Sequence, residues 1–353
     1  MSTQEKLATE KTSDAVSLKI KPDWEVFLNV NRYYSMTNIH FFFITGGRGI
    51  GKTTGFNIHN VQDFIKNGNE FVYCRRYKSE LDKTKSMFDP IVNGVKHAPI
   101  SKGLFQWEVN KVRLGYGCCL SLQQLYKSGV DFSKVTTLIY DEAILRRGGS
   151  RRYLPNEVED LFELVSTIFR ERKNYRVFVL GNNADVFSPF TEYFDIPTFE
   201  KYYLDNERGL YFELSRNSPA LIEKEKETPL YRLVKGTKYA DYHYDNKVLL
   251  NNEGKLGIKD PRARLMCRFV INTITLNIYR QSNREVFVEL KDKVIKDDLT
   301  YVITENEKPN YLYIKSLKTS DLYRFVSAAY YTDNVIYNSN KCASLFSQVI
   351  DLI

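Results

Sequence analysis

Short apolar runs alternate with longer amphipathic segments through the first two thirds of the chain. The runs at 40–45, 71–75, 136–140 and 176–180 are rich in aromatic and β-branched residues, and helix-competent segments separate several of them. Strands that alternate with helices form mostly parallel sheets. The pattern therefore predicts an α/β domain, with a helix that begins near residue 53 and an amphipathic helix over 155–169.

The remaining segments follow other patterns. Residues 105–122 predict a small antiparallel meander, 211–214 the last strand of the domain, and 219–234 a helical linker. Short aromatic runs at 269–279, 285–290 and 311–314, closed by a helical segment at 319–329, predict a separate α+β domain. We therefore divide the chain into a flexible tail (1–23), a first domain (24–216), a linker (217–250) and a C-terminal domain (251–353).

Composition restricts the class of protein. The 353 residues include five cysteines without a CxxC pair, which we interpret as reduced thiols in a cytoplasm. The polar N-terminus predicts neither a signal peptide nor a membrane span. The formal charge of +8 permits binding to a polyanion. Residues 255–296 hold ten Lys and Arg against four Asp and Glu, which makes this stretch the best candidate for an electrostatic contact with nucleic acid.

A phosphate-binding signature follows the first strand. Residues 46–53 fit the pattern GxxxxGK[ST] between a strand and a helix. Its glycines free the backbone amides to surround a phosphate at a helix N-terminus. We expect ATP with Mg²⁺, Lys52 on the β and γ phosphates, and the Thr53 hydroxyl on the metal. The predicted binding segment comprises Gly46, Gly47, Arg48, Gly49, Ile50, Gly51, Lys52, Thr53 and Thr54.

A second motif ends the strand at 136–140. Asp141 is the expected metal-side carboxylate, and Glu142 is placed to polarise the attacking water. Asn182, after the fourth strand, either senses the γ phosphate or caps a polar turn. Because 71–75 falls between the two motifs in sequence, we expect an extra strand between the motif strands. That arrangement resembles the additional-strand class of P-loop ATPases.

Two groups of cations have open interpretations. Arg170 ends the amphipathic helix, where a cation complements the helix dipole or serves as an arginine finger for a neighbouring subunit. Four arginines lie in the glycine-containing loop 146–152. They contact subunits or nucleic acid, or they are simply solvated.

Several sequence blocks together resemble one family. These are RGIGK at 48–52, FVYCRRYKSEL at 71–81, YDE at 140–142, YLPNEV at 153–158, TIFRER at 167–172 and GTKYA at 236–240. The chain resembles the DNA-packaging ATPases of small tailed phages of the phi29-like group. The resemblance implies a homopentameric ring at the portal vertex of a prohead in the host bacterial cytoplasm. It also implies that ATP hydrolysis there drives double-stranded DNA inward, with the portal as a partner and prohead RNA as a further candidate.

The resemblance also suggests roles for individual residues. By position, Arg170 looks like the trans-acting finger and Lys127 like a second trans residue at the subunit interface. Arg75 and Arg76 match a segment near the nucleotide. Arg48, four residues before the loop lysine, stays a rival finger in cis.

The family's C-terminal domain resembles an RNase H-like nuclease that has lost its active site. The basic stretch 255–296 suits binding to nucleic acid or the portal, and Lys78 is a candidate DNA contact. Asp297 and Asp298 are adjacent, so on a strand they would point to opposite faces, and we expect no nuclease activity. The N-terminal extension before Pro22 and the polar Tyr140 depart from the family pattern.

Two other functions stay open. The first is a cellular helicase or segregation-type ATPase, which would need no prohead. The second is a nucleotide-gated scaffold that binds ATP without turnover.

Overall fold

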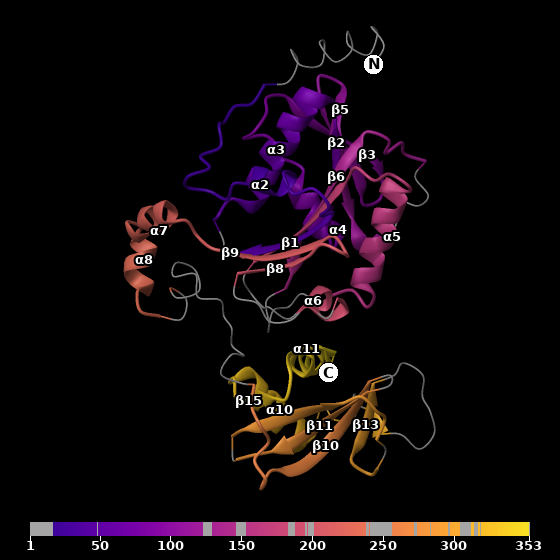
Figure 1. Ribbon diagram of the computed structural model, residues 1–353, viewed down its shortest axis with the longest axis vertical. Coiled ribbons are helices and arrows are strands. Elements are labelled where there is room, and N and C mark those ends of the chain that lie inside the picture. The colour runs from indigo at the N-terminus through magenta and orange to yellow at the C-terminus, as the bar shows by residue number, and fades with distance from the viewer. Residues whose placement is uncertain are drawn as a thin grey trace. The chain divides into compact units, whose positions relative to one another are not determined.

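The computed structural model describes residues 17–47, 49–122, 129–145, 153–182, 188–194, 196, 201–237, 240, 256–271, 274–282, 284–295, 297–303, 312–313, 317 and 319–352. The chain divides into two compact units (Figure 1). The first contains the described residues up to 240 except 188–196, and the second contains 188–196 and the described residues from 256 onward.

A nine-stranded sheet with the order β3-β4-β5-β2-β6-β7-β1-β9-β8 forms the first unit. Its parallel centre consists of β5 (Val112–Cys119), β2 (Glu70–Arg75), β6 (Val135–Ile144), β7 (Arg176–Asn182), β1 (Phe41–Gly46) and β9 (Leu210–Ser215). Antiparallel strands complete its two edges, namely β3 (Val95–Ser101) and β4 (Leu104–Val109) at one and β8 (Tyr202–Asp205) at the other. The predicted parallel core and meander are confirmed, whereas β3 and β8 were not predicted.

The expected extra strand between the motif strands exists, but its identity differs from the prediction. β7 lies between β1 and β6, while the 71–75 strand, β2, lies on the far side of β6. Order along the chain does not determine order in a parallel sheet, because each crossover connection can step over a neighbour.

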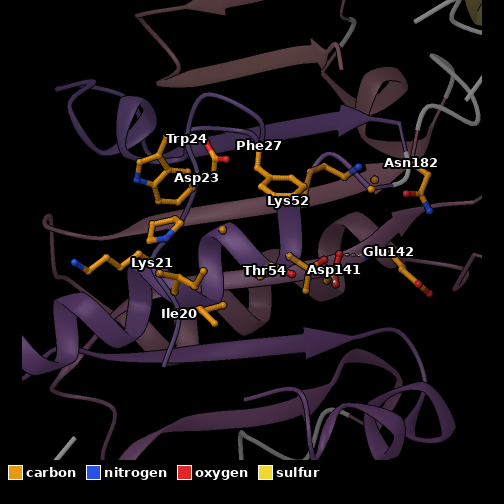
Figure 2. A pocket seen from close by; sticks show the side chains of 17 residues that line it. Ile20, Lys21, Asp23, Trp24, Phe27, Lys52, Thr54, Asp141, Glu142 and Asn182 are labelled. Carbon is orange, nitrogen blue, oxygen red and sulfur yellow. Dashed lines mark hydrogen bonds between the residues drawn. The ribbon is translucent and has the colours of Figure 1, made fainter. Parts of the chain in front are cut away.

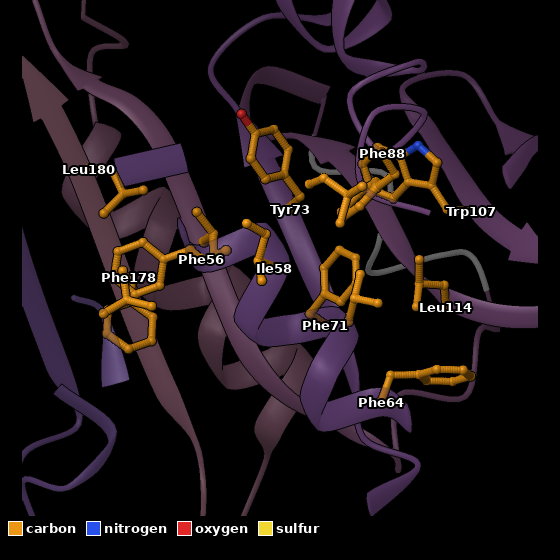
Figure 3. Close-up of a cluster of buried hydrophobic side chains, with 14 of the residues drawn as sticks. Phe56, Ile58, Phe64, Phe71, Tyr73, Phe88, Trp107, Leu114, Phe178 and Leu180 are labelled. Carbon is orange, nitrogen blue, oxygen red and sulfur yellow. The ribbon is translucent and has the colours of Figure 1, made fainter. Parts of the chain in front are cut away.

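Helices α3 (Lys52–Asn67) and α5 (Glu157–Phe169) cover opposite faces of this sheet (Figure 1). On the α3 face, Phe178 stacks with Phe42 at 5.0 Å between ring centroids and lies 4.4 Å from Phe56 (Figure 3). A second aromatic group, around Trp107 and Phe88 at 5.0 Å, packs on the same core. Each such buried ring contributes about 1.5–3 kcal/mol, so this core holds β1, β7 and α3 in place.

Shorter helices connect these elements. The first unit also contains α2 (Asn31–Tyr34) and α4 (Lys78–Leu81), and α6 (Pro189–Tyr193) belongs to the second. The predicted helical linker consists of α7 (Pro219–Lys226) and α8 (Pro229–Val234). Ser218 and Thr228 cap these helices with their side chains. Leu221 of α7 is buried with Val26 and Ile50, so the linker begins against the phosphate loop.

The second unit contains a six-stranded sheet with the order β14-β13-β10-β11-β12-β15. The predicted single run at 269–279 is wrong, because it spans two antiparallel strands, β10 (Arg264–Ile271) and β11 (Ile274–Arg280). The other strands are β12 (Val286–Lys291), β13 (Thr300–Ile303), β14 (Leu312–Tyr313) and β15 (Val335–Tyr337). Helix α10 (Asp321–Tyr331) confirms the predicted helix, and α11 (Asn340–Leu352) was not predicted. Among the described residues, no helix is long and apolar enough to cross a membrane.

Candidate active site

The phosphate loop joins the end of β1 to the start of α3. Gly51 caps α3 with φ +85°, and a Cβ there would lie 3.0 Å from the Cβ of Phe27, so only glycine fits without strain. The Lys52 side chain is buried, and its Nζ donates to the carbonyl oxygens of Gly46 (2.7 Å) and Gly47 (2.9 Å). The loop thus curls around the lysine ammonium at a helix N-terminus, which is the environment that binds phosphate. Arg48 lies outside the described residues.

Thr53 and Asp141 meet at the carboxyl edge of the sheet. The Thr53 hydroxyl donates to Asp141 Oδ2 at 2.9 Å. Two oxygens that occupy adjacent corners of an octahedral Mg²⁺ shell, each about 2.1 Å from the ion, lie about 3 Å apart. The pair therefore fits Mg²⁺, which prefers one or two carboxylates together with phosphate and water oxygens.

Glu142 follows the metal-side aspartate in an irregular stretch of β6. The pairing of β6 with β7 is interrupted between Tyr140 and Ile144, and Glu142 takes φ +54°. Its backbone N–H donates to Asp141 Oδ1 at 2.9 Å. The bulge re-aims the glutamate side chain at the strand end, as β-bulges beside active sites often do.

Arg75, at the end of β2, contacts both acids. Its guanidinium lies 2.8 Å from Glu142 Oε2 and 3.3 Å from Asp141 Oδ2, and its Nε donates to the Tyr73 hydroxyl at 3.1 Å. That hydroxyl donates in turn to Asp141 Oδ2 at 2.5 Å. Burial alone would lower the pKa of Arg75, but Tyr73 and the two carboxylates reverse this and raise it. Burial also raises the pKa of Tyr73, so both groups stay protonated donors that orient the acids.

Asn182 ends β7 beside the phosphate loop. It pairs in register with Gly46 and lines the same pocket as Glu142. The expected position at the carboxyl edge is therefore the observed one. Its neighbour Asn183 lies outside the described residues.

A pocket of about 470 Å³ extends from these polar groups to an end where Trp24 lies beside the charged Lys21 and Asp23 (Figure 2). Lys21 and Trp24 lie at one end, and Glu142 and Asn182 lie at the other. Thr54, which the sequence placed in the binding segment, also lines it. The backbone N–H of Leu28 donates to Ile50 O at 2.9 Å, which ties the N-terminal segment to the phosphate loop.

Comparison with known proteins shows the family of this chain. The model of the podovirus DNA encapsidation protein (Gp16) family matches residues 22–350. The chain belongs to this family.

Among relatives, the DNA packaging protein of Bacillus phage phi29 is 28% identical over 330 residues, which cover 92% of each chain. That of Bacillus phage B103 is 28% identical over 281 residues, covering 76% of this chain and 86% of the relative. The solved phi29 genome packaging motor assembly has a TM-score of 0.57 at 22% identity and covers 92% of this chain and 99% of its own. The phi28 gp11 packaging motor has a TM-score of 0.56 at 18% identity, with coverages of 92% and 97%. These structures share the fold.

Arg170 lies far from the phosphate loop of the same chain. It follows α5, where Phe169 stacks on Tyr175 at 4.3 Å, just before β7 begins. Asn182, at the other end of β7, is the residue beside the phosphate loop. Six residue steps along a strand span about 20 Å, so the exposed Arg170 cannot reach the pocket of its own subunit.

Other predicted residues have different positions. Lys127 and the arginine loop 146–152 lie outside the described residues. Lys78, the first residue of α4, pairs with Asp82 just after the helix. Arg76 does not contact the two acids that Arg75 contacts. Its side chain is fully buried and pairs with Glu157 instead.

Two parts of the site are not predicted by the sequence motifs. Residues 17–23 were assigned to a tail, yet Leu18 pairs with Val92, and the segment Ile20–Trp24 lines the pocket. Tyr73, which holds Asp141, was also missed. A buried tyrosine in an apolar strand carries no motif, and only its wider setting between the two motifs could have indicated it.

Proposed function

We propose that this protein is an ATP-driven DNA-packaging motor subunit that hydrolyses ATP within a homomeric ring to move double-stranded DNA into a prohead. The observation that carries the proposal is the convergence of Lys52, Thr53, Asp141 and Glu142 at one edge of a parallel sheet. The position of β7 between the motif strands supports the additional-strand class. Family membership supports packaging rather than a cellular helicase or segregation role.

Each residue has a distinct task in this proposal. Lys52 and the loop amides would hold the β and γ phosphates, while Thr53 and Asp141 would hold Mg²⁺, which would supply charge neutralisation to the phosphates. Glu142 accepts a hydrogen bond from the attacking water and aligns it with the γ phosphorus. Asn182 is close enough to the loop to contact the same phosphate or water.

The aromatic part of the pocket lining suits the nucleoside. Trp24 and Phe27 supply aromatic surface next to Gly51 and Gly55, where a flat base can pack. Aromatic stacking is tolerant of base identity, so preference for adenine would depend on polar groups at the pocket rim.

Arg170 is proposed to act in trans. Its place at the opposite edge of the sheet and its exposure support a role toward a neighbouring subunit rather than toward the pocket of the same chain. Lys127 is proposed as a second trans residue, and Arg48 stays a rival finger in cis. Doping Arg170→Ala subunits into wild-type rings should inhibit packaging more steeply than their fraction in the mixture. Inhibition in simple proportion would contradict the trans assignment.

The second unit is proposed to bind the portal and prohead RNA at the portal vertex, in the host cytoplasm. Its strand order, with β10 central and β11, β12, β13 and β14 around it, supports an RNase H-like arrangement. Asp297 is paired with Arg268 and accepts hydrogen bonds from Leu299 and Thr300. A carboxylate used in this way supports the absence of nuclease activity.

Glu142→Gln tests the enzymatic part. Turnover should fall by about 10²–10⁴-fold while ATP binding persists, because the amide keeps the shape but accepts no proton. Unchanged turnover would remove Glu142 as the base. A wild-type protein that binds ATP without any turnover would instead support the nucleotide-gated scaffold.

A further inference from the structure

Arg76 is a fully buried cation next to the active site. Its side chain has 0% exposure, as does that of Glu157, and the two form a two-pronged pair. Arg76 Nε donates to Glu157 Oε2 at 2.7 Å, and Nη2 donates to Oε1 at 2.6 Å. Burying two charges costs several kcal/mol per ion before their attraction offsets it, so stability alone is a weak reason for such a pair.

The remaining donors of Arg76 reach the bulge that carries Glu142. Nη2 also donates to Ala143 O at 2.7 Å, and Nη1 to Glu142 O at 3.4 Å. These carbonyls belong to the stretch where β6 loses its regular pairing with β7. A buried carbonyl needs a partner, and the guanidinium supplies one where the neighbouring strand does not.

Glu157 links the same pair to the start of α5. It is the first residue of that helix, and it also accepts hydrogen bonds from the Tyr140 hydroxyl (2.7 Å) and the Leu154 N–H (2.9 Å). Four donors therefore use the acceptor sites of one carboxylate. This explains the polar Tyr140 in an otherwise apolar strand.

We propose that Arg76 and Glu157 are positioning residues that hold the backbone of Glu142 in its bulged conformation and join it to α5. Neither side chain lines the pocket, so each acts through Glu142. The inference rests on the proposed ATPase function. Because Arg170 ends α5, the pair also links the base of one subunit to the helix that carries the finger for the next.

Arg76→Lys is the test variant. Lysine keeps the charge but cannot reproduce the planar fork that reaches Glu157 and two carbonyls together. Loss of an outer-shell partner of this kind costs about 10–100-fold in activity. We expect kcat for ATP to fall by about that factor, while the Kd for ATP changes less than about threefold, because the phosphate loop is untouched.

The matched control is Arg113→Lys. Arg113 also pairs with a glutamate of the same sheet, Glu70, at 2.9 Å, but away from the bulge. Its kcat should stay within about twofold of the wild-type value. If Arg76→Lys fails to fold, Tyr140→Phe replaces it, since this variant removes one donor to Glu157 and should lower kcat by about 3–10-fold at unchanged Kd.

Two results would overturn the inference. One is an unchanged kcat in folded Arg76→Lys. The other is a parallel loss of kcat and ATP affinity, which would indicate general damage to the site. These two results can be interpreted only if the wild-type protein turns over ATP and its turnover depends on Glu142. A failure of the proposed function would therefore appear first, in the wild-type and Glu142→Gln measurements.

Discussion

The left-handed backbone of Glu142 predicts a conflict between stability and activity. A non-glycine residue at φ +54° costs roughly 1–2 kcal/mol relative to the right-handed region. Glu142→Gly removes that cost together with the carboxylate, whereas Glu142→Gln removes the carboxylate and keeps the cost. Comparing the two variants therefore isolates the backbone contribution.

The expected difference can be worked out term by term. Both variants lose the ion pair with Arg75, which is worth about 0.2–1 kcal/mol because Glu142 is 40% exposed, and this loss cancels in the comparison. Glycine also lowers the stability of the fold by about 0.5–1 kcal/mol, because it increases the conformational entropy of the unfolded chain. The midpoints of these ranges leave the glycine variant more stable by about 0.75 kcal/mol, and by at most about 1.5 kcal/mol, which corresponds at the midpoint to about 2–3 °C in Tm for a unit of this size.

Calorimetry of the full chain measures this difference. The relevant unfolding transition is the one whose Tm rises when ATP is added to the wild-type protein. Phosphate release, measured in parallel, should be lost in both variants. Lys111 offers a control, because it has φ +67° in the turn between β4 and β5, away from the site. The Lys111→Gly variant should be more stable than the Lys111→Gln variant by a similar amount, and both should keep full turnover. If the glycine advantage occurs at Lys111 and not at Glu142, the bulge is not strained, and the reasoning is refuted.

Three further outcomes are expected. Tyr73→Phe should lower turnover about 3–10-fold and raise the Mg²⁺ concentration needed for half-maximal activity, because Asp141 loses an orienting donor; an unchanged Mg²⁺ titration would contradict this. Burial lowers the pKa of His59 from 6.5 to about 4, so the fold binds fewer protons than the unfolded chain between these values. Stability to urea should therefore fall by about 1–3 kcal/mol as the pH drops from 6.5 to 4, and less in His59→Gln. Arg172→Ala should cost about 2–3 kcal/mol in urea unfolding, since Arg172 donates to five backbone carbonyls, while Arg170→Ala should change stability by less than about 0.5 kcal/mol.

Local patterns were sufficient to predict most of the first unit. The strands that carry the two motifs are continuous apolar runs, and such runs suit strands buried on both faces. The phosphate loop and the Asp141-Glu142 pair follow these strands directly, so their meeting at one edge follows from the parallel sheet. The α5 helix was predicted for a similar reason, because its apolar positions recur at helical spacing.

Contacts between distant segments could not be predicted in this way. Trp24 and Phe27 lie in a segment without a motif, and they reach the site only because Leu28 bonds to the phosphate loop. The turn between β10 and β11 was missed for a different reason. The end of β10 and the start of β11 are both rich in apolar and β-branched residues, so the run shows no change of period between the two strands.

The adjacent arginines at the end of β2 have different tasks. Arg75 is the last residue of the strand, Arg76 lies in the bend that follows, and their side chains reach different partners. Arg75 contacts the two acids on the pocket side, and Arg76 contacts Glu157 at the start of α5. Composition makes both residues look like ligands for phosphate or DNA. Only Arg75 is placed to respond when a nucleotide occupies the pocket, whereas Arg76 holds the backbone on which that response depends.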